Sequence, residues 1–294
     1  MKKQLQLSIN LPFAYYTELD SATGAPLLRY PSPSMIRQYA DALCAEMDLW
    51  KDCSELEINS IRFEGGYIHL LKEEQLSQLL DKIQAVFSLS GDCEWIALTC
   101  PGRYLTGIAP LLAARRFKIL LDIPTFIKEE ADSHMLPFGP EFARGELADF
   151  PAAGIRMLRE VDGRTPEQVE MIRKKLSEIR PVRVEMVTLN GRNEETLAGC
   201  GLQEYLLQTG YHRVCLNEYA LPEGEFRHRH DISILSEYIG LGLGAVSAYD
   251  SYLSRNVGDF KAYVSASGNP AMLYKEVKNS QRICKSGSLQ FPKS

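Results

Sequence analysis

The feature that most constrains this chain is a repeated alternation of strand-type and helix-type segments. Residues 5–11 alternate apolar with polar side chains until Pro12, which predicts a strand. Residues 34–50 carry apolar side chains at three- and four-residue spacings, which predicts an amphipathic helix with Ser34 as its N-cap. The two patterns then alternate as strand 57–63, helix 73–87, strand 94–99, helix 105–115, strand 118–123, strand 155–161, helix 166–179 capped by Thr165, and strand 182–188.

Repeated units of this kind require parallel strands joined by right-handed crossovers. They either open into a doubly wound sheet or curl into a barrel, and both place ligand chemistry at the C-terminal ends of the strands. The last third of the chain changes character. It predicts helix 195–209, strand 213–219, a basic loop at 227–230, strand 238–243, and short helices at 259–265 and 272–278.

Composition and charge exclude several classes of protein. The chain has 294 residues, 45% of them hydrophobic and 24% charged, as expected of a folded, soluble protein. Its formal net charge of -5 disfavours nucleic acid as a partner. The longest nearly apolar run, residues 239–249, is about half of the ~20 residues that a membrane crossing needs. No signal-peptide pattern is seen, so we expect a cytoplasmic protein with reduced cysteines and no membrane span.

Several motifs, taken in order, resemble those of one enzyme family. Residues 7–13, Leu-Ser-Ile-Asn-Leu-Pro-Phe, are similar to its Y-I-H-I-P-F-C segment, and residues 61–71 are similar to its I-y-f-G-G-G-T-P-s-L-L segment. Further matches follow at residues 94–102, 117–126, 210–224 and 237–247, the last resembling Y-l-G-l-G-x-G-A-h-S. Over roughly residues 5–265, the chain therefore resembles the oxygen-independent coproporphyrinogen oxidase-like radical SAM proteins, including their haem-chaperone branch.

The resemblance implies a fold and a domain organisation. Residues 1–190 are expected to form a partial (β/α)6 TIM-like barrel of the radical SAM type. Residues 191–280 are expected to form a small α+β extension packed on that barrel, and residues 281–294 a flexible tail. The winged-helix-like terminal domain of the family is expected to be absent.

The resemblance does not extend to the cluster ligands. The family holds a 4Fe-4S cluster on three thiolates spaced C-x-x-x-C-x-x-C, which leaves one iron free to chelate S-adenosylmethionine. The corresponding positions here are Ala14, Glu18 and Ser21. Iron in such a cluster needs soft anionic donors, and Ala14 has no lone pair at all. We therefore expect that no cluster assembles.

Positions that would bind S-adenosylmethionine are also changed. Glu64 replaces the first residue of the family's triple glycine, so that only Gly65 and Gly66 remain, and Tyr67 follows them. Four further positions, at consecutive predicted strand ends, lose the family's polar contacts: Leu98, Cys100, Lys118 and Leu120. Each lost polar contact typically costs ~1 to 3 kcal/mol, so S-adenosylmethionine is not expected to bind in the family's manner. Such a pattern indicates a pseudoenzyme, with aromatic side chains such as Tyr67 filling the vacated space.

One stretch is rich in metal-binding side chains. His228, His230 and Asp231 lie close together in the basic loop, and His212 is a further candidate ligand. Two imidazoles at i and i+2 face the same side of an extended segment, so the group could hold zinc, or one imidazole could bind haem iron. The alternative interpretation is a solvated basic loop, because no cysteine lies nearby to complete a tetrahedral site.

These observations favour a protein without catalytic activity over an enzyme. The leading hypothesis is a cluster-free, radical SAM-like binding or partner protein, with a tetrapyrrole or an active radical SAM enzyme as its two candidate partners. Any ligand is expected at the barrel mouth, near residues 12–21, 64–69 and 98–102. The alternative is an enzyme with repurposed chemistry, either on a metal at His228, His230 and Asp231 or through the carboxylates of Glu18 and Glu64.

Overall fold

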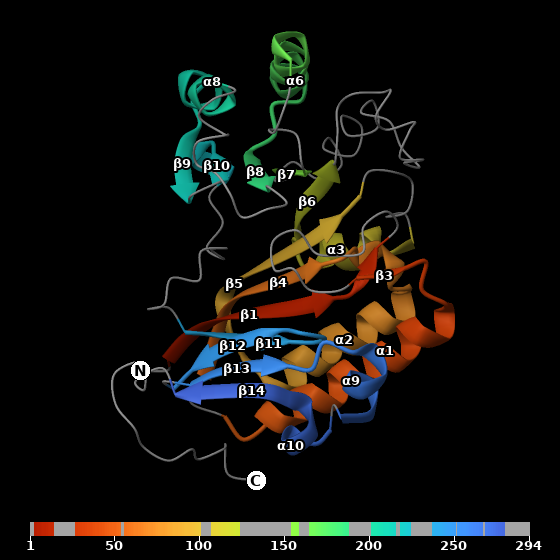
Figure 1. The fold of residues 1–294 in the computed structure, drawn as a ribbon. Coiled ribbons are helices and arrows are strands. Elements are labelled where there is room, and N and C mark those ends of the chain that lie inside the picture. The colour runs from red at the N-terminus through yellow and green to blue at the C-terminus, as the bar shows by residue number, and fades with distance from the viewer. Residues whose placement is uncertain are drawn as a thin grey trace.

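The protein is an α/β structure organised around one mixed sheet, seen in a computed structural model (Figure 1). The structure describes residues 3–14, 27–53, 56–100, 107–123, 154–158, 165–187, 201–215, 218–224, 237–250, 252–266 and 268–279. Within these residues the sheet has 12 strands in the order β14-β13-β12-β11-β1-β4-β5-β6-β7-β8-β10-β9.

Six parallel strands form the central part of this sheet and follow one another in chain order. They are β1 (Lys3–Leu11), β4 (Leu56–Gly65), β5 (Ser88–Thr99), β6 (Lys118–Ile123), β7 (Gly154–Leu158) and β8 (Arg183–Val187). The helices between them include α1 (Pro33–Met47), α2 (Glu73–Val86), α3 (Ala109–Ala114) and α6 (Pro166–Ile179). The predicted series of parallel β/α units is therefore confirmed.

Two helix starts show how local sequence fixes these elements. Thr165 caps α6 as predicted, because its hydroxyl accepts a hydrogen bond from the Gln168 amide while the Gln168 side chain accepts one from the Thr165 amide. For α1 the predicted cap was wrong by two residues. Ser32 is the N-cap and accepts from the Met35 amide, since Pro33 already occupies the first helical position.

The C-terminal third adds strands at both edges of the sheet (Figure 1). At one edge, β10 (Glu218–Ala220) pairs antiparallel with β8, and β9 (His212–Cys215) pairs antiparallel with β10. At the other edge, β11 (Tyr238–Leu241) pairs parallel with β1, followed by the antiparallel strands β12 (Val246–Tyr249), β13 (Tyr252–Asn256) and β14 (Tyr274–Asn279). The short helices are α8 (Leu202–Gln208), α9 (Phe260–Ala266) and α10 (Pro270–Leu273).

Two predictions in this region were wrong. The single strand expected at 213–219 is the antiparallel pair β9 and β10. The helix expected at 272–278 ends at Leu273, and the chain continues as β14, whose ladder partner is β13. Edge strands of this kind owe their conformation to the strand beside them, so their own short sequences carry a weak signal.

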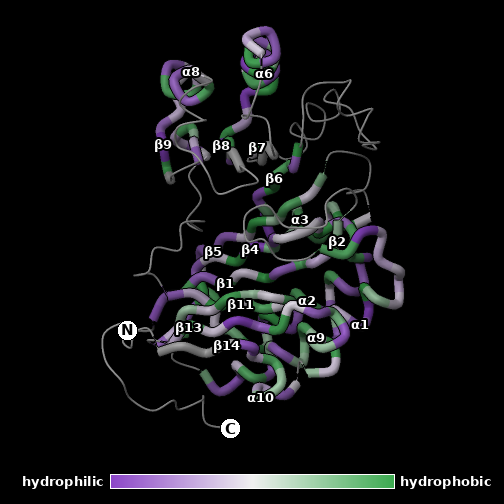
Figure 2. Tube along the Cα trace, in the orientation of Figure 1, coloured by the Kyte–Doolittle hydropathy of each residue, from purple (hydrophilic) through white to green (hydrophobic). Residues whose placement is uncertain are grey.

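The alternation along the central strands separates two faces. On β1, Leu5, Leu7, Ile9 and Leu11 belong to the main apolar core, which they share with residues of α1 and α2. Hydrophobic and hydrophilic residues alternate on the tubes of α1 and α2, as amphipathic helices require (Figure 2). The opposite faces of β1 and β4 carry the polar side chains Ser8, Asn10, Arg62 and Glu64. This second face holds the candidate site. No helix in the described residues is long and apolar enough to cross a membrane.

Candidate functional site

The C-terminal ends of β1, β4, β5 and β6 are where this class of fold binds its ligands. Two short elements follow them: β2 (Phe13–Ala14), which pairs parallel with β3 (Leu28–Arg29), and the helical turn η2 (Ile68–Leu70). A separate apolar cluster, here called the mouth cluster, lies at these ends. Its members are Ala14, Leu27, Tyr67, Ile96, Leu98, Cys100 and Leu120. Five of the positions singled out from the sequence therefore lie together: Ala14, Tyr67, Leu98, Cys100 and Leu120.

The backbone at the end of β4 packs directly against the end of β1. The Tyr67 amide donates to the Phe13 carbonyl oxygen at 2.9 Å. A Cβ on Gly66 would lie only 2.0 Å from that same oxygen, and one on Gly65, which has φ +83°, would lie 1.9 Å from Asn10 Oδ1. Only glycine allows so close an approach. Gly65 and Gly66 thus serve contacts within this chain.

Tyr67 is the largest side chain of the mouth cluster. Only 1% of it is exposed, and its hydroxyl donates to Asp122 Oδ2 at 2.8 Å. Its ring stacks on the His69 imidazole, with centroids 5.5 Å apart and planes inclined by 14°. Tyr67 therefore ties the end of β4 to the end of β6 across the mouth.

His69 connects the same cluster to the end of β5. Its Nδ1 lies 2.6 Å from Thr99 Oγ1, and its Nε2 lies 3.6 Å from the Cys100 sulfur. Burial lowers the pKa of His69 to about 3, so the imidazole is neutral at physiological pH. The order of thiol, imidazole and hydroxyl resembles that of a nucleophile, its base and an orienting group. A neutral imidazole cannot stabilise a thiolate as an imidazolium would, and Cys100 is 0% exposed. Both features are typical of a structural thiol and not of an activated nucleophile.

A buried ionic network lies beside the mouth cluster, on β4, β8 and β10. Arg62 makes a two-pronged contact with Glu185, at 3.1 and 2.9 Å, and its Nε lies 3.2 Å from Glu64. Arg183 contacts Glu185 at 3.1 Å and also bonds Glu218. Burial opposes the charge on Arg62, but the carboxylates of Glu185 and Glu64 outweigh it, so the pKa of this guanidinium is raised.

Glu64 also faces a cavity, whose volume is about 230 Å³. Side chains and backbone from β1, β4, β11, β13 and the β11–β12 turn surround it. The residues that line it are Ser8, Asn10, Glu64, Tyr238, Gly240, Gly244, Ala245, Val246 and Arg255. Among the described residues, this face of the sheet thus carries buried apolar side chains on β5 and β6 and a cavity beside β1 and β11.

Other predicted site residues lie elsewhere. Lys118 stands at the start of β6, at the opposite end from the mouth, and its ammonium bonds Glu94. His212 lies on the edge strand β9. The remaining predicted positions, Glu18, Ser21, His228, His230 and Asp231, fall outside the residues that the structure describes. Within the described residues, no three His, Cys, Asp or Glu side chains form a group that could hold a metal ion.

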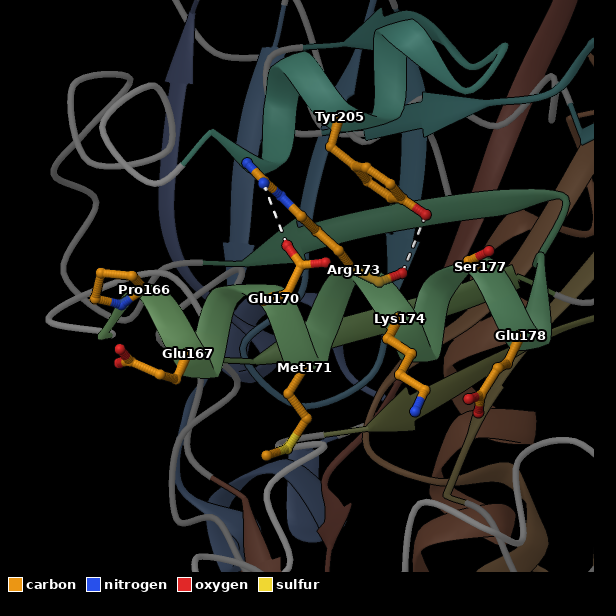
Figure 3. Close-up of a pocket in the computed structure, with 9 residues that line it drawn as sticks. All are labelled: Pro166, Glu167, Glu170, Met171, Arg173, Lys174, Ser177, Glu178 and Tyr205. Atoms are coloured by element: carbon orange, nitrogen blue, oxygen red, sulfur yellow. Dashed lines mark hydrogen bonds and ion pairs between the residues drawn. The ribbon is translucent and has the colours of Figure 1, made fainter.

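A second hollow lies on the outer surface, along α6 and next to Tyr205 of α8 (Figure 3). Glu170 and Arg173 form an i,i+3 ion pair at 3.6 Å, and the Tyr205 hydroxyl donates to the Arg173 carbonyl at 3.0 Å. Figure 3 shows Glu167, Lys174 and Glu178 pointing away from α8. This arrangement is typical of a solvated helix face.

Several of these functional groups were missed by sequence reasoning. The alternation along β4 and β6 does place Arg62 and Asp122 on the inner face. Their partners Glu185 and Tyr67 are 123 and 55 residues away in sequence, and no local pattern links such pairs.

The architecture defines the class: this chain has an α/β fold of the radical SAM type. Coproporphyrinogen III oxidase (HemN) from Escherichia coli, a radical SAM enzyme, has a similar structure, with a TM-score of 0.78 and 18% identity over 95% of this chain and 72% of that one. More distant structures include anSMEcpe with bound AdoMet (TM-score 0.44, 12% identity, 70% and 59% covered) and SuiB of Streptococcus suis bound to S-adenosylmethionine (0.43, 13%, 70% and 45%). No family model and no curated protein matches the sequence.

Proposed function

We propose that this protein uses a radical SAM-type fold without the family's cluster and acts by binding a ligand or a partner rather than by radical catalysis. The observation that carries the proposal is the mouth cluster, which packs apolar side chains together at the ends of β1, β4, β5 and β6. Interiors packed in this way leave little room for a cofactor.

The described side chains do not suit a 4Fe-4S cluster. Ala14, at the first ligand position, offers no donor atom and is 1% exposed among Leu27 and Tyr67. The one thiol in the mouth cluster, Cys100, contacts His69. Three further cysteines, Cys44, Cys53 and Cys93, pack against the main core instead. Cluster assembly needs several convergent thiolates, which this packing does not supply.

The same contacts argue against S-adenosylmethionine in the family's position. Gly65 and Gly66 pack closely against Asn10 and Phe13 on the side where a Cβ would lie. The Tyr67 amide is bonded to Phe13, and its ring occupies the mouth. Leu98 and Leu120 offer only apolar surface to any polar ligand.

Anaerobic reconstitution of the intact protein with iron and sulfide tests the proposal. We expect iron bound at the level of a mock-treated sample, and no 5'-deoxyadenosine when S-adenosylmethionine and a reductant are added. A triple variant, Ala14→Cys/Glu18→Cys/Ser21→Cys, restores the ligand spacing and leaves Tyr67 in place. We expect it to take up iron poorly until Tyr67→Ala is added, because both ligands and space are needed. Stoichiometric cluster in the unmodified chain would refute the proposal.

The binding role rests on the hollow part of the inner face. A cavity of about 230 Å³ lies below the ~300 to 1,000 Å³ usual for drug-sized ligands, so it favours a molecule smaller than a tetrapyrrole. A tetrapyrrole is too large for this cavity. Titration with haemin, followed by its visible absorption, tests whether the ligand is a tetrapyrrole. We expect no saturable one-to-one complex.

An enzyme with repurposed chemistry is the alternative proposal. It would use a metal on His228, His230 and Asp231, with His212 as a further ligand, or the carboxylates of Glu18 and Glu64. Metal analysis after extensive dialysis distinguishes the two proposals. One zinc or iron per chain, lost in a His228→Ala/His230→Ala variant, would favour the enzyme.

A further inference from the structure

Hydrogen bonds link the elements that border the cavity beside Glu64. The Tyr39 hydroxyl donates to the Asn10 carbonyl at 2.6 Å and accepts from the Leu243 amide at 2.8 Å. The Asn10 side-chain amide in turn donates to the Leu243 carbonyl. Ser247 bonds both the amide and the carbonyl of Gly240, at 2.9 and 3.0 Å. The β11–β12 turn, which borders the cavity, is therefore tied to β1 and α1.

Glu64 supplies a negative charge to the cavity. It stands opposite Asn10 in the β1–β4 ladder, and 15% of its side chain is exposed. One of its oxygens is paired with Arg62. An ionised carboxylate has about four acceptor sites, so its oxygens can accept from more than one donor.

Arg255 supplies the opposite charge from β13. Its side chain lines the same cavity and is exposed, and its described contacts include no ion pair with a carboxylate. Both charges act on the hydroxyl group of Tyr238. Burial raises the pKa of Tyr238, the charge of Glu64 raises it further, and the charge of Arg255 lowers it. Glu64, Tyr238 and Arg255 thus present an acceptor, a hydroxyl and a cation to one small space.

We infer that this cavity binds a small zwitterion of the α-amino acid type, with its ammonium group at Glu64 and its carboxylate at Arg255. The hydroxyl groups of Tyr238 and Ser8 would complete its hydrogen bonds. Glu64 would repel a purely anionic ligand, and Arg255 would repel a purely cationic one. An apolar ligand would desolvate both charges without compensation. This inference gives a ligand class to the proposed binding role and rests on it.

Isothermal titration with each of the twenty L-amino acids in turn tests the inference. We expect saturable one-to-one binding for at least one of them. For that ligand, the analogue without the amino group and the analogue without the carboxyl group should each bind ~10-fold or more weakly, because each loses a charge-assisted contact. The same loss is expected for Arg255→Gln, while Arg255→Lys should bind with intermediate affinity.

Matched variants keep the test interpretable. Lys261→Gln removes one positive charge from an exposed site on α9 and should leave the affinity unchanged. Glu64→Gln should weaken binding, and because it also loses a partner of Arg62, circular dichroism must show that it folds. No saturable binding of any amino acid, or binding that Arg255→Gln and Glu64→Gln leave unchanged, would overturn the inference. The cluster-free proposal is decided separately, by iron reconstitution.

Discussion

Replacing Tyr67 is the sharpest structural test of a packed mouth. Tyr67→Phe removes a hydroxyl that donates at 2.8 Å to Asp122, a carboxylate that is 3% exposed. Removing one partner of a buried hydrogen bond leaves the other unsatisfied, which costs ~1 to 3 kcal/mol, and we expect the free energy of unfolding to fall by about that amount. Tyr67→Ala also removes a ring stacked on His69, and aromatic-to-alanine changes in cores cost ~3 to 5 kcal/mol.

Urea unfolding, followed by circular dichroism, measures both changes. Tyr30→Phe serves as the control, because this tyrosine is 68% exposed and loss of its hydroxyl should change the free energy of unfolding by less than ~0.5 kcal/mol. The expected order of stability is Tyr30→Phe, then Tyr67→Phe, then Tyr67→Ala. A Tyr67→Ala protein within ~1 kcal/mol of the parent would show that the ring is not part of a close-packed interior, and the reasoning would fail.

Three further predictions follow from the described contacts. Burial raises the pKa of Glu46 to about 7, against the hydrogen bonds from Tyr263, Asn256 and Gly242 that lower it. Between pH ~4.5 and ~7 the folded state therefore binds more protons at Glu46 than the unfolded chain does, so the free energy of unfolding falls as the pH rises through this range. Glu46→Gln should flatten this pH dependence of the free energy of unfolding. Alkylation mapped by mass spectrometry should modify buried Cys100 more slowly than half-buried Cys53, and faster labelling of Cys100 would instead indicate an activated thiol. Gly66→Ala should destabilise the protein by ~1 to 3 kcal/mol in thermal unfolding. The control Gly91→Ala, where a Cβ meets nothing within 4 Å, should not destabilise it. Equal effects of the two changes would contradict the close contact at Gly66.

Much of the fold could be predicted from local patterns because the central strands and helices carry strong ones. The helix α6 begins and ends at the predicted residues, and Thr165 caps it as expected. The strands β12, β13 and β14 were missed or misassigned. They form an antiparallel ladder at the sheet edge, where pairing with the neighbouring strand decides the conformation.

The candidate site was predicted only in part. The resemblance singled out Ala14, Leu98, Cys100 and Leu120, and the structure brings them together in the mouth cluster. The Glu64 side chain was predicted to occupy the space of the family's ligand or, in the alternative hypothesis, to act as an acid–base carboxylate; in the structure it pairs with Arg62 and lines the cavity. That role depends on β13, whose Arg255 is 191 positions further along the chain (255 − 64), and a sequence pattern cannot show such a juxtaposition.

The buried ionic network raises a separate point about the scaffold. Arg62 and Arg183 are both 0% exposed, and each is bonded to a glutamate. Removing one partner of a buried pair leaves an uncompensated charge, which typically costs ~3 to 5 kcal/mol. The network therefore holds β4, β8 and β10 in one arrangement and fixes the position of Glu64 at the cavity wall.

The account depends most on the absence of radical chemistry at the mouth, and electron paramagnetic resonance tests this directly. The protein would be reconstituted anaerobically with iron and sulfide, reduced with dithionite and measured at low temperature, alongside an active radical SAM enzyme treated in the same way. We predict that the enzyme gives the signal of a reduced 4Fe-4S cluster and that this protein gives none. A reduced-cluster signal from this chain, altered on addition of S-adenosylmethionine, would contradict the account.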